Sequence, residues 1–87
     1  MKEISIEVSK ELLQKLGHKF KVLREQRNLT PKDISFHTGI DASDVTRIET
    51  GKLNITFRTF CKLVAVLDIH PRELFDFEFE IDKFKSD

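Results

Sequence analysis

The sequence has little of what metal-binding and disulfide-linked domains depend on. Among 87 residues there is one cysteine, and there is no tryptophan or tyrosine. One thiol excludes an internal disulfide and cannot form a cysteine-rich zinc site. This residue, Cys61, lies in the apolar helical pattern of residues 60–64, so we expect a core or partly buried thiol.

Long apolar runs and glycine-rich segments are missing as well. No apolar run has the length that a membrane span needs. Residues 1–7 alternate charged with apolar side chains, unlike a secretory signal. Together with the single cysteine, these features predict a cytoplasmic protein. The three glycines lie at helix or turn positions and make no phosphate-binding loop.

The usual patterns of a catalytic or metal site are also lacking. His18, His37 and His70 have no ligand-like spacing with cysteines, carboxylates or one another. Ser43 has no histidine base nearby in any placement that the pattern allows. The sequence therefore predicts a protein that is not an enzyme and that has no metal and no cofactor.

Charge of one sign is not in excess, since 15 Lys and Arg side chains balance 15 Asp and Glu. Neutrality by itself argues against a nucleic-acid partner, but the charges are unevenly distributed. Residues 1–32 carry eight basic and four acidic side chains, whereas residues 71–87 carry three and six. A basic first part and an acidic end are compatible with one positively charged face.

Both ends of the chain show strand-like alternation. The alternating apolar residues are Ile4, Ile6 and Val8 at one end and Phe77, Phe79 and Ile81 at the other. This pattern predicts an N-terminal arm over residues 1–8 and an acidic, Phe-rich C-terminal arm over residues 76–87. A two-stranded ribbon is marginal alone, so the arms would pair within one chain or across a dimer. The alternative is frayed ends.

Between the arms, apolar residues at helical spacing predict an all-α domain of five helices over residues 9–75. The first helix carries the stripe Leu12, Leu13, Leu16, Phe20 and Leu23, and runs to about Arg27. The predicted N-caps are Ser9, Thr30, Asp41, Thr56 and His70, and the predicted helix ends are Asn28, Gly39 and Gly51. Pro31 and Pro71 suit first helical positions.

The most informative segment is about residues 31–50, where a tight turn at residues 39–41 joins two short helices. Apolar side chains fall where each helix must face the other, at Ile34, Ile40, Val45 and Ile48. Ser35 is small where the two helices would pass closest. This is the pattern of a helix-turn-helix motif, whose second helix lies in the major groove of DNA.

Short motifs along the chain resemble those of one family. They lie at residues 16–24, 28–30, 38–41, 67–69 and 73–75, and residues 47–52 read Arg-Ile-Glu-Thr-Gly-Lys. Over about residues 16–75, the sequence resembles the Cro/lambda-repressor or XRE family. The resemblance implies a lambda-repressor-like DNA-binding domain and a buried or half-buried salt bridge between Arg24 and Glu49.

For function, the resemblance implies a transcriptional regulator, a repressor that binds an inverted-repeat operator as a homodimer. By position, the base-facing side chains would be Ala42, Ser43, Thr46 and Arg47. Thr30 and Lys32, with the amide at the start of the second helix, would hold a phosphate. Lys52, Asn54 and Arg58 would reach the DNA backbone or the minor groove.

Four residues depart from this picture. Pro31 lacks the N–H and the side-chain donor of a phosphate contact. Asp41 and Asp44 bring negative charge to the third helix, the first interpreted as its cap and the second as a capping partner facing the loop. Ile55 replaces the proline usual after Gly-Lys. Pro31, the two aspartates and the zero net charge favour an alternative function, a protein-interaction module or antitoxin-like partner protein that uses an exposed Phe36 and the Phe-rich tail.

Overall fold

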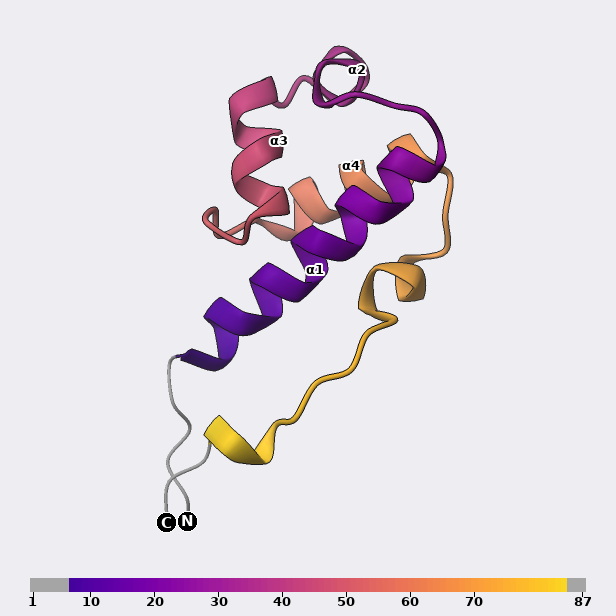
Figure 1. The fold of residues 1–87 in the computed structure, drawn as a ribbon. Coiled ribbons are helices and arrows are strands. Elements are labelled where there is room, and N and C mark those ends of the chain that lie inside the picture. The colour runs from indigo at the N-terminus through magenta and orange to yellow at the C-terminus, as the bar shows by residue number, and fades with distance from the viewer. Residues whose placement is uncertain (1–6, 85–87) are drawn as a thin grey trace.

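The computed structural model describes residues 7–84, which form four α-helices and two short 3-10 helices. The elements are α1 (Glu7–Gln26), α2 (Pro31–Thr38), α3 (Ala42–Glu49), α4 (Phe57–Leu67), η1 (Pro71–Phe75) and η2 (Asp82–Phe84). No β-strand occurs within residues 7–84. Figure 1 shows α1 running across the molecule, with α2 and α3 above it and the segment after α4 returning below it.

The core lies where the C-terminal half of α1 meets the other helices. Leu16, Phe20 and Leu23 recur at helical spacing on α1 and are buried. The other buried apolar side chains of this cluster are Ile34, Val45, Ile48, Leu63, Leu67 and Leu74. Each such side chain contributes on the order of 1.5–3 kcal/mol by leaving water. The core therefore joins every helix from α1 to η1.

The boundaries of α2 follow the predicted caps, and α3 begins directly after Asp41, whose side chain makes no capping hydrogen bond although it was predicted as the cap. The Thr30 hydroxyl accepts a hydrogen bond from the Asp33 amide, and the Asp33 carboxylate accepts one from the Thr30 amide. Two amides at the helix start are thus satisfied together. Gly39 ends α2 at a φ of 79°, a left-handed conformation that glycine adopts without steric cost. The predicted helix end at Asn28 is confirmed by its φ of 56°.

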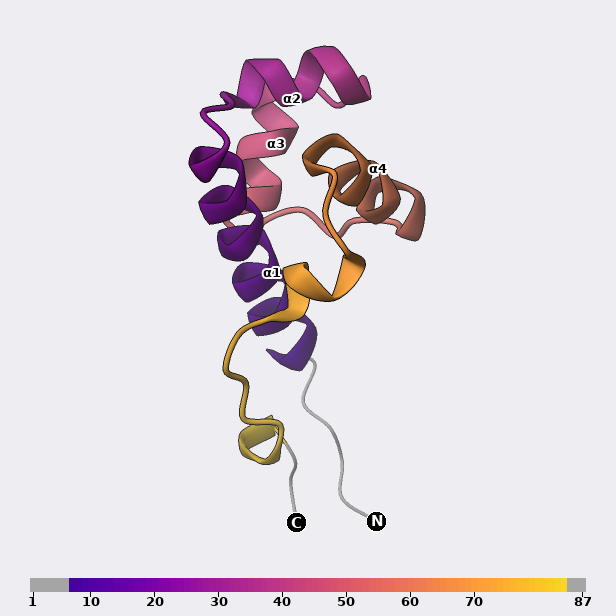
Figure 2. The same cartoon turned by 90° about the vertical axis from the view of Figure 1, so that its right-hand side faces the viewer.

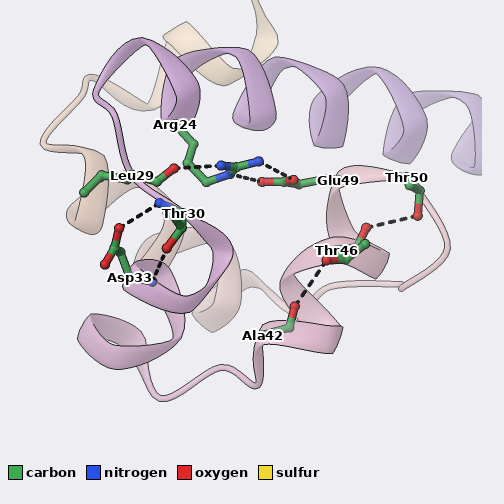
Figure 3. A network of polar contacts seen from close by, with 8 residues as sticks. All are labelled: Arg24, Leu29, Thr30, Asp33, Ala42, Thr46, Glu49 and Thr50. Atoms are coloured by element: carbon green, nitrogen blue, oxygen red, sulfur yellow. Dashed lines mark hydrogen bonds and ion pairs between the residues drawn. The ribbon is translucent and has the colours of Figure 1, made fainter.

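A buried ion pair fixes α3 against α1 (Figure 3). Arg24 donates from Nε to Glu49 Oε2 at 2.6 Å and from Nη2 to Oε1 at 3.0 Å, and its Nη1 donates to the Leu29 carbonyl at 2.7 Å. The hydrogen bond to Glu49 raises the pKa of Arg24 above its usual value despite the opposing effect of burial. The predicted salt bridge is confirmed. Removing one partner would leave a buried charge uncompensated, at a cost of about 3–5 kcal/mol.

The predicted N-terminal arm lies mostly outside the described residues, which begin at Glu7. Glu7 and Val8 belong to α1, which therefore starts before the predicted cap Ser9. Val8 fits a strand alternation but also continues the helical spacing through Leu12 to Leu16, and the helix includes it. Glu7 suits the positive N-terminal end of a helix.

The helix predicted as the fifth is a 3-10 helix, Pro71–Phe75. The described residues therefore contain four α-helices, and the count of five is not confirmed. Five residues are too few for a stable α-helix, and a 3-10 turn is usual in such short pieces. The predicted cap is confirmed, because the His70 side chain accepts from the Arg72 amide at 3.2 Å. The Glu73 carboxylate in turn accepts from the His70 amide at 2.9 Å.

The predicted C-terminal strand is also absent from the described part, residues 76–84. Phe77 and Phe79 are half-buried while Glu78 and Glu80 are exposed, so the alternation is present, but no strand within residues 7–84 pairs with it. Figure 2 shows this segment descending beside the N-terminal half of α1. It ends at the buried Phe84.

Cys61 is exposed, contrary to the expectation of a core or partly buried thiol. The buried residues of α4 are Leu63 and Leu67. Cys61 precedes Leu63 by two residues, which is about 200° around a helix of 3.6 residues per turn. The thiol therefore points away from the core.

Candidate nucleic-acid interface

The outward face of α3 carries four of the predicted contact residues. Ser43, Thr46 and Arg47 are exposed and Ala42 is half-buried. Val45 and Ile48 lie on the opposite face and are fully or almost fully buried. Because the buried face is packed on α1 and α2, the outward face has a fixed orientation. Figure 1 shows α3 at the margin of the molecule, with α2 beyond its N-terminal end.

Hydroxyl groups on α3 bond to the helix itself (Figure 3). Thr46 donates to the Ala42 carbonyl at 3.3 Å, and Thr50 donates to the Thr46 carbonyl at 3.1 Å. These bonds use the hydroxyl protons and leave the oxygen lone pairs. Thr46 thus presents a methyl group and a hydrogen-bond acceptor to any partner of this face.

Arg47 is held by its own helix. Its Nη1 donates to Asp44 Oδ1 at 3.2 Å, and the two side chains keep 52% and 38% of their exposure. Asp44 was interpreted as a capping partner facing the loop, and the structure pairs it with Arg47 instead. The spacing of three residues on one helix is the signal that identifies such a pair. The negative charge that argued against DNA is thereby partly neutralised.

The start of α2 is already occupied by its capping box. The Thr30 amide, and then the Thr30 side chain, lower the pKa of Asp33, so its carboxylate stays ionised here. Pro31 has no N–H, and the Asp33 amide is bonded to Thr30. Among the described hydrogen bonds of this first turn, none engages the Lys32 amide. Lys32 is exposed, so its ammonium is a donor left at the predicted phosphate site, and the Thr30 hydroxyl, which only accepts in the capping box, keeps its own proton to donate.

The remaining predicted contact residues lie in the loop after α3 and in the first turn of α4. Gly51 turns the chain at a φ of 73°, and the Lys52 amide donates to the Arg47 carbonyl at 2.8 Å. Lys52, Asn54 and Arg58 are exposed. Between them the half-buried Leu53 and Ile55 pack against the core, which explains how the loop keeps its course without the usual proline.

Thr56 caps α4 as predicted, since its hydroxyl accepts from the Thr59 amide at 3.1 Å. Of the nine predicted contact residues, eight are exposed and Ala42 is half-buried. The structure brings four of them together on one face of α3.

Other kinds of site find no support in the described residues. Residues 7–84 contain no group of three or more His, Cys, Asp or Glu side chains placed to hold a metal ion. None of the helices in this range combines the length and the apolar character of a membrane-spanning helix.

A family model described as a helix-turn-helix domain matches residues 15–76. The chain belongs to this helix-turn-helix family. The matched range contains α2, α3, the turn between them and most of α1, and it agrees with the resemblance to XRE proteins in the sequence. A search of curated protein sequences gives no match.

Solved structures support the same assignment. The restriction-modification controller protein C.AhdI from Aeromonas hydrophila is 37% identical, with a TM-score of 0.69, over 71% of this chain and 94% of its own. A transcriptional regulator of the HTH_3 family from Vibrio cholerae is 22% identical, with a TM-score of 0.72, over 77% of this chain and 38% of its own.

The restriction-modification controller protein C.Esp1396I, solved as a tetramer on its natural 35 base-pair operator, is 22% identical. It matches with a TM-score of 0.67 over 75% of this chain and 86% of its own. At this identity, the last two structures show the fold alone. The helix-turn-helix match leaves out the first turns of α1 and the tail after Asp76.

Proposed function

We propose that this helix-turn-helix protein is a transcriptional regulator, a repressor that binds an inverted-repeat operator as a homodimer. The observation that carries the proposal is the outward face of α3, where Ser43, Thr46 and Arg47 stand exposed on a helix clamped to α1 by the Arg24–Glu49 pair. A rigid helix with a polar outer face is what major-groove recognition requires. The likeness to C.AhdI, a restriction-modification controller, supports the same class of function.

Each side chain of this face has a chemistry that suits base edges. Arg47 keeps Nε and Nη2 for the O6 and N7 atoms of guanine, because Asp44 engages only Nη1. Ser43 donates or accepts, Thr46 accepts, and Ala42 contacts a thymine methyl group. Together they read about one half-site.

The backbone contacts come from two further places. Lys32 and Thr30 at the start of α2 meet one phosphate, with the α2 N-terminus adding a partial positive charge. Lys52, Asn54 and Arg58 meet the phosphates or the minor groove beside α3. Since a dimer presents two copies of α3, its half-sites would lie about one helical turn apart, ~34 Å.

The test is selection from random-sequence duplex DNA at two salt concentrations. The wild type is expected to enrich a palindromic site and to lose affinity steeply as salt rises. Arg47→Ala should weaken binding to that site by roughly tenfold to a hundredfold, since a bidentate guanine contact is worth about 1–3 kcal/mol. Arg72→Ala removes an exposed arginine of η1, away from α3, and serves as the matched control. Absence of enrichment, with weak binding that Arg47→Ala leaves unchanged, would overturn the proposal.

One observation favours the alternative, a protein-interaction module. Phe36 on α2 is 84% exposed, and its described ring contact is a T-shaped one with the neighbouring His37. An aromatic side chain so exposed suits a protein partner. This function would be established instead if the selection enriched no DNA site and the chain bound a protein partner that the Phe36→Ser variant no longer binds.

A further inference from the structure

The first turns of α1 lie against the loop that follows α3. A Cβ placed on Gly51 would stand 2.6 Å from the Cα atom of Gln14 and 2.7 Å from its amide nitrogen, so the two backbones touch there. Three residues later on α1, Gly17 approaches the Ile48 carbonyl in the same way. One side of α1 therefore faces the end of α3 and its loop, and Gln14 and Gly17 mark that side.

Lys10 lies on the same side of α1. It precedes Gln14 by four residues and Gly17 by seven, and residues at these spacings share one face of a helix. Lys10 is exposed, and within residues 7–84 no ion pair engages it. Its position on α1 therefore offers an uncommitted ammonium group beside the loop after α3.

This loop holds one of the proposed backbone contacts, Lys52, which is exposed and follows Gly51 directly. Four residues of helix rise ~6 Å, so Lys10 stands about that far along α1 from the point where Gly51 rests on Gln14. Phosphates of one DNA strand follow at about 3.4 Å along the duplex axis, so this displacement corresponds to about two phosphates. Figure 1 shows the first turns of α1 continuing past the loop, on the side of the molecule to which the loop projects.

The tail after η1 packs on another side of α1. Lys19 lines a groove beside Phe77 of the tail. Nine residues separate Lys19 from Lys10, which is about 180° around a helix of 3.6 residues per turn. The described part of the tail therefore does not cover the side of Lys10. Lys10 keeps its place through the contact of Gln14 with Gly51, not through the tail.

We propose that Lys10 binds a DNA phosphate of its own, beyond the one that Lys52 meets, so that the first turns of α1 extend the DNA-binding surface. The proposal rests on the proposed function, because it needs a duplex that lies along α3. The family match begins at residue 15, so this contact lies outside the matched helix-turn-helix domain. The opposite charge of Glu7, three residues before Lys10, limits the expected gain to one phosphate.

The test is the salt dependence with which the full chain binds random-sequence duplex DNA. Each phosphate contact adds about 0.9 to the slope of log K against log salt, so Lys10→Ala should make the slope shallower by about 1. Lys10→Arg should restore it. Lys19→Ala is the matched control, because it removes the same charge from the opposite side of the same helix, and it should leave the slope unchanged. Circular dichroism should show the wild-type helical content in all three variants.

A double variant shows whether Lys10 and Lys52 meet different phosphates. Lys52→Ala alone should make the slope shallower by about 1, and the combination with Lys10→Ala should make it shallower by about 2. If the two lysines shared one phosphate, the double variant would lose no more than Lys52→Ala alone.

Three results would overturn the Lys10 contact alone. They are a slope that Lys10→Ala leaves unchanged, an equal loss in Lys19→Ala, which would reflect net charge, and a double variant that loses no more than Lys52→Ala. A wild type that binds no DNA would overturn the contact and the proposed function together. A slope that depends on Lys10, in a protein that selects no operator, would keep the contact and refute the proposed function.

Discussion

Asp44 puts a carboxylate on the face that we propose meets DNA, yet it also holds Arg47 at 3.2 Å. The two effects have opposite consequences. Repulsion from phosphates lowers affinity for every DNA sequence, whereas a fixed guanidinium improves discrimination, because less rotamer freedom is lost on binding. A positioning role for Asp44 therefore predicts that affinity and specificity change in opposite directions.

The variant Asp44→Ala should bind random duplex DNA more tightly, by roughly fivefold for about 1 kcal/mol of relieved repulsion. It should also discriminate less between the selected operator and random DNA. Asp44→Asn, which keeps a hydrogen-bond acceptor for Arg47, should retain more of the discrimination. Dissociation constants for both DNAs at one salt concentration measure the two quantities. If both affinities improve equally, Asp44 only repels DNA and does not position Arg47.

At this scale the predictions from the sequence were correct for some residues and wrong for others. Arg24 and Glu49 were paired correctly through the family resemblance, and Phe36 was correctly expected to be exposed. The expectation for Cys61 was wrong because an apolar run does not reveal which side of a helix each residue faces. The Asp44–Arg47 pair was missed although its spacing was visible.

At the scale of elements, α2 and α4 could be placed from the sequence because their starts are marked by local chemistry, whereas Asp41 at the start of α3 makes no capping hydrogen bond. Thr30 and Thr56 cap through side-chain hydrogen bonds that depend only on nearby residues. The predicted strand at Phe77 and Phe79 failed because a strand needs a partner, which alternation alone does not supply. The contact between the Phe60 and Phe75 rings could not be predicted, since it depends on how η1 folds back against α4.

Gly17 shows how α1 positions α3. A Cβ at this residue would overlap the carbonyl oxygen of Ile48 and crowd the backbone of Glu49, so the two helices can approach this closely only at glycine. Helix propensity alone predicts that Gly17→Ala stabilises the protein by about 1 kcal/mol. The close approach of the two helices predicts instead that Gly17→Ala destabilises the protein.

We expect Gly17→Ala to lower the free energy of unfolding by about 1–3 kcal/mol, the usual cost of overpacking. Operator affinity should fall as well, because α3 must move away from α1. Urea unfolding measures the first effect. Lys21→Ala, a change at an exposed residue of the same helix, is the control and should stay within about 0.5 kcal/mol of the wild type. Stabilisation by Gly17→Ala would show that the helices do not depend on this contact.

At the scale of the whole molecule, the tail and the first turns of α1 form a separate contact outside the family match. Lys83 Nζ lies 2.8 Å from Glu11 Oε1 and 5.2 Å from the centre of the Phe84 ring. Phe79 and Phe84 stack with centroids 5.5 Å apart. Phe77, which packs against the core, precedes this contact in the chain. The stability of the first turns of α1 and the binding of DNA by α3 are therefore expected to be independent.

Deleting residues 79–87 tests whether the stability of the first turns of α1 is independent of DNA binding. Loss of the buried Phe84 should lower the free energy of unfolding by about 1.5–3 kcal/mol. Hydrogen exchange should accelerate at residues 7–14, whose packing partner is gone. Operator binding should stay at the wild-type value, because α3 and its packing on α1 and α2 are intact. Lys83→Ala removes only a partly exposed ion pair and should cost less than about 1 kcal/mol. A truncated chain that loses its dimer would instead support pairing of the terminal arms between copies.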